Sequence, residues 1–165
     1  SFMLALTNPH GIVAGANTTD DYQLGFQTGY KGQFFNLAYG ADGFGFTDVL
    51  YLDYTGGFDV TDSFFLGINA AYANSSDADS GYQGIALYLQ QTLSETFSLG
   101  LRPEFYTTTS GAGDASQTAF TLTGNTNLTD SLKLVTEVRY DTSNDVTFFG
   151  EKDITGLTVA TVYTF

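Results

Sequence analysis

Several residue types are scarce in this chain of 165 residues, and each scarcity narrows what the protein can be. It has no Cys, no Trp, 2 Pro and 1 His, and only 5 Lys plus Arg against 18 Asp plus Glu, which gives a net charge of −13. Without Cys there is no disulfide, no thiolate zinc site and no cysteine nucleophile. With so few cations we expect no nucleic-acid partner, because binding to phosphates needs a basic surface.

Long hydrophobic runs are also missing, and no stretch approaches the roughly 18 apolar residues that indicate a spanning helix. Glycine and aromatic residues are abundant instead, with 19 Gly, 15 Phe and 11 Tyr. Such an aromatic content speaks against a disordered chain. The length allows a single domain over residues 1–165, large enough to bury a core or close a barrel. Because Ser1 is neither Met nor the start of a signal peptide, we expect a mature, cut or engineered piece.

The strongest signal is an alternation of apolar and polar residues with a period of two. Between Leu132 and Asp141, every second residue is Leu, Leu, Thr, Val and Tyr, and the residues between them include four charges. Because side chains in a strand point to alternate faces, this segment has one apolar and one charged face. The pattern predicts ten strands, at about 1–8, 21–31, 33–41, 48–57, 63–74, 81–93, 96–108, 117–128, 131–142 and 154–165. Most exceed the usual soluble strand of about 5–6 residues and suit the roughly 9–11 tilted residues that cross a bilayer.

The connections between these segments alternate between long and short. Asn8–Asp20 and Asp141–Asp153 are long, Lys31–Gln33 is tight and Gly57–Asp62 is short. Outer-membrane barrels have short turns at one end and long loops at the other. The alternation therefore favours such a barrel over a soluble sandwich.

Three of the short connections share one pattern, which is apolar, hydroxyl, acid, hydroxyl, apolar. They are Val60–Phe64, Leu93–Phe97 and Leu128–Leu132. Asp, Ser and Thr suit tight turns because their side chains form hydrogen bonds with nearby backbone groups. The pattern predicts a repeat of one hairpin, although unrelated turns could converge on the same chemistry.

The orientation of the two faces decides between a soluble and a membrane protein. A soluble sandwich buries its apolar face, whereas a membrane barrel turns that face outward to lipid. Aromatic residues crowd the segment ends, as in interfacial girdles. Glycines such as Gly25, Gly67 and Gly100 lie on the polar face, where small residues relieve crowding in a narrow closed sheet. We therefore expect an all-β fold, a closed antiparallel up-and-down transmembrane β-barrel of about 10 strands in bacterial outer-membrane lipid. A soluble sandwich is the weaker alternative.

Some short motifs resemble a known family. They are Leu99–Tyr106 with its Arg-Pro-Glu-Phe, the hairpin Leu122–Leu134, the Glu-Val-Arg-Tyr-Asp of Glu137–Asp141, and Val162–Phe165. The chain is similar to the C-terminal portion of the OmpL-like outer-membrane β-barrel porins, whose members are longer and have more strands. This resemblance implies an outer-membrane pore. The terminal Phe165 also resembles the C-terminal signal of bacterial outer-membrane proteins, which implies the barrel-assembly machinery as a partner.

The predicted register places four positive and four negative charges on the inward face. These candidate pore-lining residues are Lys31, Asp53, Arg102, Glu104, Lys133, Glu137, Arg139 and Asp141. Most lie on the segments 96–108 and 131–142, so long Arg and Glu side chains could bridge over the short residues of the segment between them. The charges could form a constriction that filters ions, or a salt-bridge lattice that fills the lumen. Ten strands are near the filled end of barrel sizes, so any pore should be narrow.

The long connections carry a separate acidic field. Asp20, Asp21, Asp42, Asp48, Asp77, Asp79, Asp114, Asp145, Glu151 and Asp153 are opposed by Lys152 alone. A ring of carboxylates attracts cations and repels anions, so we expect weak cation preference if the protein conducts. Divalent cations are candidate partners at these acidic connections. A solvated surface that keeps the loops soluble is the alternative.

Evidence for catalysis or cofactors is thin. Asp77-Ala-Asp79 has the spacing of a calcium-loop start, but no bidentate Glu follows at the right distance. His10 is the single His and would need a positioned Ser beside it to form a catalytic triad. Glu104 and Glu137 could act as an acid–base pair, but each has an Arg two residues away, so ion pairing is the better interpretation of these two carboxylates. We therefore expect no enzyme and no cofactor. The predicted function is a narrow passive diffusion pore for ions and small solutes, with a non-conducting structural or adhesive barrel as the alternative.

Overall fold

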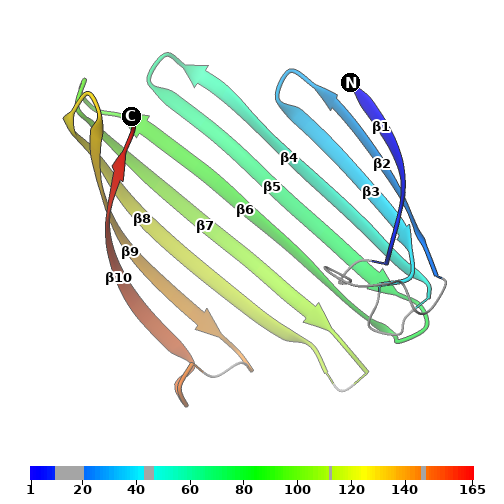
Figure 1. Ribbon diagram of the computed structural model, residues 1–165. Coiled ribbons are helices and arrows are strands. Elements are labelled where there is room, and N and C mark those ends of the chain that lie inside the picture. Colours follow the sequence, from blue (N-terminus) through cyan, green and yellow to red (C-terminus); the bar gives the residue numbers. More distant parts are fainter. Residues whose placement is uncertain (10–20, 43–46, 112, 146–147) are drawn as a thin grey trace. The chain divides into compact units, whose positions relative to one another are not determined.

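The computed structural model describes residues 1–9, 21–42, 47–111, 113–145 and 148–165. All regular elements in these ranges are strands: β1 (Phe2–Thr7), β2 (Gln23–Tyr30), β3 (Gln33–Gly40), β4 (Val49–Thr61), β5 (Phe64–Ser75), β6 (Ser80–Thr92), β7 (Phe97–Thr109), β8 (Ala115–Thr129), β9 (Leu132–Ser143) and β10 (Asp153–Tyr163). They form one sheet in chain order, β1 to β10, as an up-and-down meander (Figure 1). The ten predicted strands are thereby confirmed. Within the same ranges, no helix has the length and apolar character needed to cross a membrane.

The strand pairing that the structure describes does not establish closure of the sheet into a barrel. Its order begins at β1 and ends at β10, and these two strands do not pair in the part of the chain that is described. The antiparallel ten-strand meander is therefore established, whereas the expected barrel closure is not.

Strand β4 is longer than its sequence predicts. The glycine pair Gly56–Gly57 suggests a strand end at residue 57, yet β4 continues to Thr61. The reason lies in two neighbouring side chains: Gln33 lies against Gly56, and a Cβ atom on Gly57 would come within 2.5 Å of the Phe65 ring. The glycines therefore make room for side chains inside the sheet. The short connection predicted at Gly57–Asp62 is corrected to the two residues Asp62 and Ser63.

The described residues form two compact units. Unit 1 comprises Ser1–Gly56, Asn69–Gly84 and Thr107–Asp114, and it holds the ladder of β1, β2, β3 and β4. Its β2–β3 turn consists of Lys31 and Gly32, with φ angles of 48° and 78°. Two successive positive φ angles are typical of the type I′ turn, whose twist suits a two-residue hairpin.

Unit 2 comprises Gly57–Ile68, Ile85–Tyr106 and Ala115–Phe165. Its pairings of β8 with β9 and of β9 with β10 place Arg139 beside Thr121 on one side and Gly156 on the other. The β8–β9 ladder has one irregularity, between Asn127 and Thr129, just before the turn.

The three turns with the repeated sequence pattern also share one hydrogen bond. The backbone N–H of Ser63 donates to Thr61 Oγ1, that of Thr96 to Ser94 Oγ, and that of Ser131 to Thr129 Oγ1, each at 3.3 Å. In each turn the first hydroxyl accepts from the residue two positions later. The sequence repeat is therefore a structural repeat, and all three copies lie in unit 2.

Burial in the sheet is the reverse of burial in a soluble protein. In unit 2 the apolar side chains of Leu122, Val138 and Val159 are 48%, 46% and 63% exposed, whereas Thr121 and Asp141 on the opposite face are 1% and 8% exposed. Unit 1 shows the same contrast, with Leu24 exposed and its neighbour Gln23 buried. Apolar residues normally fill the interior and carboxylates the surface. In each unit the apolar face of these strands is therefore the more exposed one, as the alternation predicts.

Candidate functional site on the polar face

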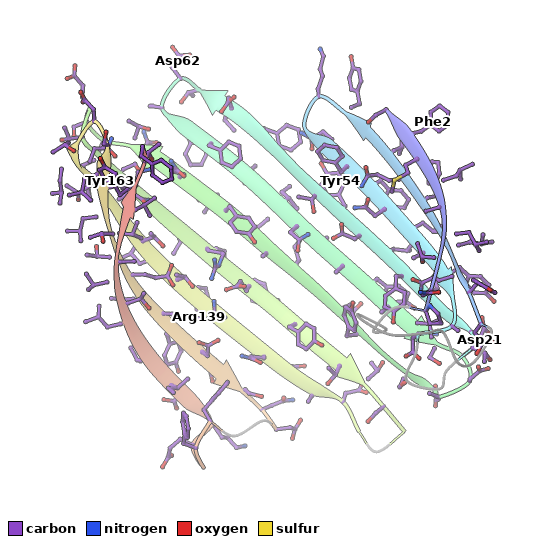
Figure 2. The ribbon with its side chains drawn as sticks, viewed as in Figure 1. Phe2, Asp21, Tyr54, Asp62, Arg139 and Tyr163 are labelled. Carbon is purple, nitrogen blue, oxygen red and sulfur yellow. The ribbon has the colours of Figure 1, made fainter. Side chains whose placement is uncertain are left out.

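Four of the eight predicted charged residues form a single ion-pair network in unit 2. Arg139 on β9 holds Asp141 through two hydrogen bonds of 2.9 Å, from Nε to Oδ2 and from Nη2 to Oδ1. Its Nη1 also forms a salt bridge with Glu104 on β7. Glu104 in turn accepts from Nε of Arg102 at 3.1 Å. The network therefore crosses from β7 to β9 over β8, as the register predicts, and Figure 2 shows Arg139 in the middle of its strand.

Thr121 on β8 lies beneath this network. Its Oγ1 accepts hydrogen bonds from Arg139 Nη1 at 3.2 Å and from Arg102 Nη2 at 3.5 Å. Only a short side chain leaves space for guanidinium groups from both neighbouring strands to meet above it. Gln117 lies four residues before Thr121 on the same face of β8. Its Nε2 extends the network by donating to Asp141 Oδ1 at 3.2 Å.

The two arginines are held differently. Every guanidinium nitrogen of Arg139 has a partner, whereas Nη1 of Arg102 has none within the described ranges. The Arg102 guanidinium also lies 5.9 Å from the centroid of the Tyr88 ring, within the range of a cation–π contact. Arg139 therefore links β7, β8 and β9 with all its guanidinium nitrogens, while Arg102 still has N–H groups that can donate to a further acceptor.

The remaining predicted charges on β9 lie outside this network. Glu137 accepts a hydrogen bond from Thr123 Oγ1 at 3.1 Å. Lys133 is exposed and lines grooves near the short turns. Both share the polar face with Arg139, because residues two apart on a strand point the same way.

Unit 1 has a polar ladder of its own, built from amides around Asp53. Gln27 Nε2 donates to Asn36 Oδ1 at 2.7 Å, and Asn36 Nδ2 donates to Asp53 Oδ1 at 2.7 Å. Asn69 Nδ2 completes the chain by donating to Asp53 Oδ2 at 3.0 Å. Sequence reasoning identified Asp53 alone. The signal for the amides was present, because each lies on the polar face of its strand, but the alignment between strands was needed to join them.

Lys31 is placed differently from its prediction. It belongs to the two-residue β2–β3 turn rather than to the wall of a strand, and its Nζ lies 5.4 Å from the centroid of the Tyr30 ring. A residue in a turn does not follow the pleat, so the alternation that assigned it an inward direction does not apply.

The acidic residues of the longer connections are partly tied to their neighbours. Asp48, just before β4, accepts hydrogen bonds from the Ser76 and Tyr39 hydroxyls. These bonds, with Ser76 the stronger influence, hold the pKa of Asp48 below its ordinary value. Asp77 Oδ2 accepts from Oγ1 and from the backbone N–H of Thr47, at 2.7 and 3.1 Å.

These bonds bear on the calcium-like spacing of Asp77-Ala-Asp79, because Asp77 already serves as an acceptor within the protein. In the described ranges no group of three or more His, Asp or Glu side chains is arranged to hold a metal ion. Two residues considered in the sequence, His10 and Asp20, lie outside those ranges.

The whole chain, residues 1–165, matches the protein family described as "Putative beta-barrel porin-2, OmpL-like". The chain belongs to this family. Among curated proteins, a search finds no match. Membership indicates an outer-membrane pore in general terms, with a bacterial outer-membrane location and a channel rather than an enzyme. The all-β meander and its outward apolar face agree with that assignment.

Proposed function

We propose that this OmpL-like chain closes into a barrel in the outer membrane and acts as a narrow passive pore for ions and small solutes, with weak cation preference. The observation that carries the proposal is the reversed burial, in which apolar side chains such as Leu122 and Val159 are exposed while Thr121 and Asp141 on the opposite face are buried. In hydrocarbon every backbone N–H and C=O must be paired, which favours closure of the sheet.

The ion-pair network explains why the pore should be narrow. Arg102 and Glu104 on β7 and Arg139 and Asp141 on β9 meet over the short Thr121 of β8, so they occupy space above the wall. A small barrel has little room beyond its own side chains. Ions and small polar solutes are therefore the expected cargo.

The cation preference rests on charge. The chain carries −13 overall, and the network itself is balanced, with two arginines and two carboxylates. The surplus of carboxylates, including those on the longer connections, raises the local concentration of cations.

Single-channel recording in a planar bilayer tests the proposal. Discrete ohmic steps are expected, with a reversal potential in a KCl gradient that is displaced toward the potassium equilibrium potential. Two substitutions on the same face of β9 provide opposite controls: Glu137→Gln should weaken the cation preference and Lys133→Gln should strengthen it. A folded protein that inserts into the bilayer without current steps would overturn the pore.

A non-conducting structural barrel is the second candidate, and one observation favours it. Arg139 is saturated by Asp141, Glu104 and Thr121, so the network is rigid enough to serve as internal packing. The same recording separates the two candidates, because packing alone gives an insulating membrane.

A further inference from the structure

A row of grooves lies on the polar side of unit 2 near the repeated turns, apart from the ion-pair network. One groove, of about 380 Å³, is lined by Asp59, Thr61, Asp62, Ser63, Phe64, Phe65, Gln90 and Thr92. A second, of about 190 Å³, lies between Gln90 and Lys133 and includes Asn125 and Asn127. A third, of about 650 Å³, includes Asn127, Asp130 and Lys133.

These grooves share lining residues and therefore adjoin one another along the turn end of unit 2. The first and second have Gln90 and Thr92 in common, and the second and third have Glu95, Thr96, Asn127 and Lys133 in common. We call this the turn-end track. The two larger grooves each fall within the roughly 300–1,000 Å³ typical of small-molecule sites, so the track suits a solute with several linked units better than a single ion.

Three amide side chains of the turn-end track are open for binding. In the described part of the chain, the amides of Gln90, Asn125 and Asn127 have no hydrogen-bond partner, in contrast to the tied groups around Arg139. Each amide offers two donors and an acceptor oxygen. Groups that both donate and accept match hydroxyls, which do the same.

An aromatic platform lies at one end of the track. The Phe65 ring covers two glycines, because a Cβ atom would come within 2.5 Å of it at Gly57 and within 3.1 Å at Gly67. The glycines let the ring lie against the wall, while 38% of the residue stays exposed. The face of an aromatic ring is partially negative and attracts C–H groups, such as those on the apolar face of a pyranose.

The charges of the track select against anions. Asp59, Asp62, Glu95 and Asp130 line it, and Lys133 is the single cation among its described lining residues. An anionic solute would meet this surplus of carboxylates with unfavourable energy. A neutral solute rich in hydroxyls would not.

We propose that the turn-end track binds short neutral oligosaccharides, with a sugar ring on Phe65 and hydroxyls on the amides of Gln90, Asn125 and Asn127. The inference rests on the proposed function, since the track would then line the pore wall and the oligosaccharide would be a transported solute. It extends that function from ions and small solutes in general to one chemical class.

Saturation-transfer NMR on the full folded chain in detergent micelles tests the proposal. Maltotriose is the neutral probe, and trigalacturonate is the anionic trisaccharide compared with it. Maltotriose should receive magnetisation from the protein and trigalacturonate should not. Gln90→Ala and Phe65→Ala should each weaken maltotriose binding at least fivefold. Gln91→Ala is the matched control, because it removes the same side chain from the next residue of β6, on the opposite face, and should leave binding unchanged.

The outcomes separate this inference from the pore itself, because the NMR measurement needs no current. Absence of transfer to maltotriose in a chain that conducts would overturn the oligosaccharide site alone. Equal losses in the Gln90 and Gln91 variants, with circular dichroism showing both folded, would also overturn it. Maltotriose binding with no conductance would support the site and refute transport.

Discussion

At the residue scale, Thr121 shows how one small polar side chain organises the charged wall. It is 1% exposed, and its hydroxyl accepts from both Arg102 and Arg139. Thr121→Val keeps the shape but removes the acceptor, so we expect the free energy of unfolding to fall by about 1 kcal/mol. Urea unfolding in detergent micelles measures the change.

Thr118→Val is the control for that prediction. Thr118 lies three residues before Thr121 on β8, opposite Thr142 of β9. Because side chains alternate between the two faces of a strand, Thr118 points to the apolar face. The same substitution there should leave stability unchanged or slightly raised, since a hydroxyl is exchanged for a methyl facing lipid. Equal losses at both positions would show that β propensity, rather than the arginine contacts, governs the effect.

Asp48 gives a residue-scale prediction about pH. Its pKa in the folded protein is lowered by the Ser76 and Tyr39 hydroxyls, so the unfolded chain binds its proton more readily. The resulting stabilisation is fully present above the ordinary carboxyl pKa and is lost as pH falls through the lowered value. Asp48→Asn should therefore destabilise the protein at about pH 7 and should differ less from the parent near pH 2 to 3. Unfolding midpoints at both pH values test this, and a difference that does not change with pH would contradict it.

At the element scale, the repeated turns join strands through one hydroxyl each. In the β8–β9 turn, Thr129 Oγ1 accepts the Ser131 N–H at 3.3 Å. Thr129→Ala removes this acceptor and should lower the free energy of unfolding by about 0.5–1 kcal/mol. Thr129→Ser retains the oxygen and should restore most of the loss. If Ser and Ala behave alike, the methyl group rather than the hydrogen bond is the stabilising feature.

The strands themselves could be predicted from the sequence because their two faces meet different surroundings. The alternation in Leu132–Asp141 reproduces β9 within two residues at its C-terminal end, and the other strands apart from one also lie close to their predicted bounds. The exception is β4, where a glycine pair that suggests a turn instead accommodates Gln33 and Phe65. A local pattern cannot report which side chains from neighbouring strands will fill a gap.

The candidate site was only partly predictable for a related reason. Alternation assigns each residue to a face, which was enough to place Glu104 and Arg139 on either side of β8. It does not give the alignment between strands, which joins Asn36 to Asp53 and Asn69 in unit 1. Lys31 lies in the turn after β2, where the pleat has ended, so the alternation does not give the direction of its side chain.

At the scale of the whole molecule, the reversed burial makes the apolar face dependent on its surroundings. Outside a membrane, water would contact exposed apolar side chains such as Leu157 and Val159. The free-energy cost is roughly 25 cal/mol for each Å² of apolar surface in contact with water. Lipid or detergent removes that penalty. The end strands β1 and β10 impose a separate demand, because lipid offers no hydrogen bonds to their backbone edges.

Closure of the sheet through β1 and β10 is therefore the decisive whole-molecule prediction. The chain has no Cys, so introduced pairs cross-link without background. Leu6→Cys combined in turn with Leu157→Cys, Val159→Cys, Thr161→Cys or Tyr163→Cys scans the possible alignments along the outward faces. In folded protein in lipid vesicles, one or two neighbouring combinations should oxidise to a disulfide, since Cα atoms of paired strands fall within the required 4.4–6.8 Å. Leu6→Cys with Ala160→Cys is the control and should stay reduced, because its Cβ atoms point to opposite faces. Failure of every outward pair would mean that the two edges meet other strands, and the ten-strand pore proposed above would be wrong.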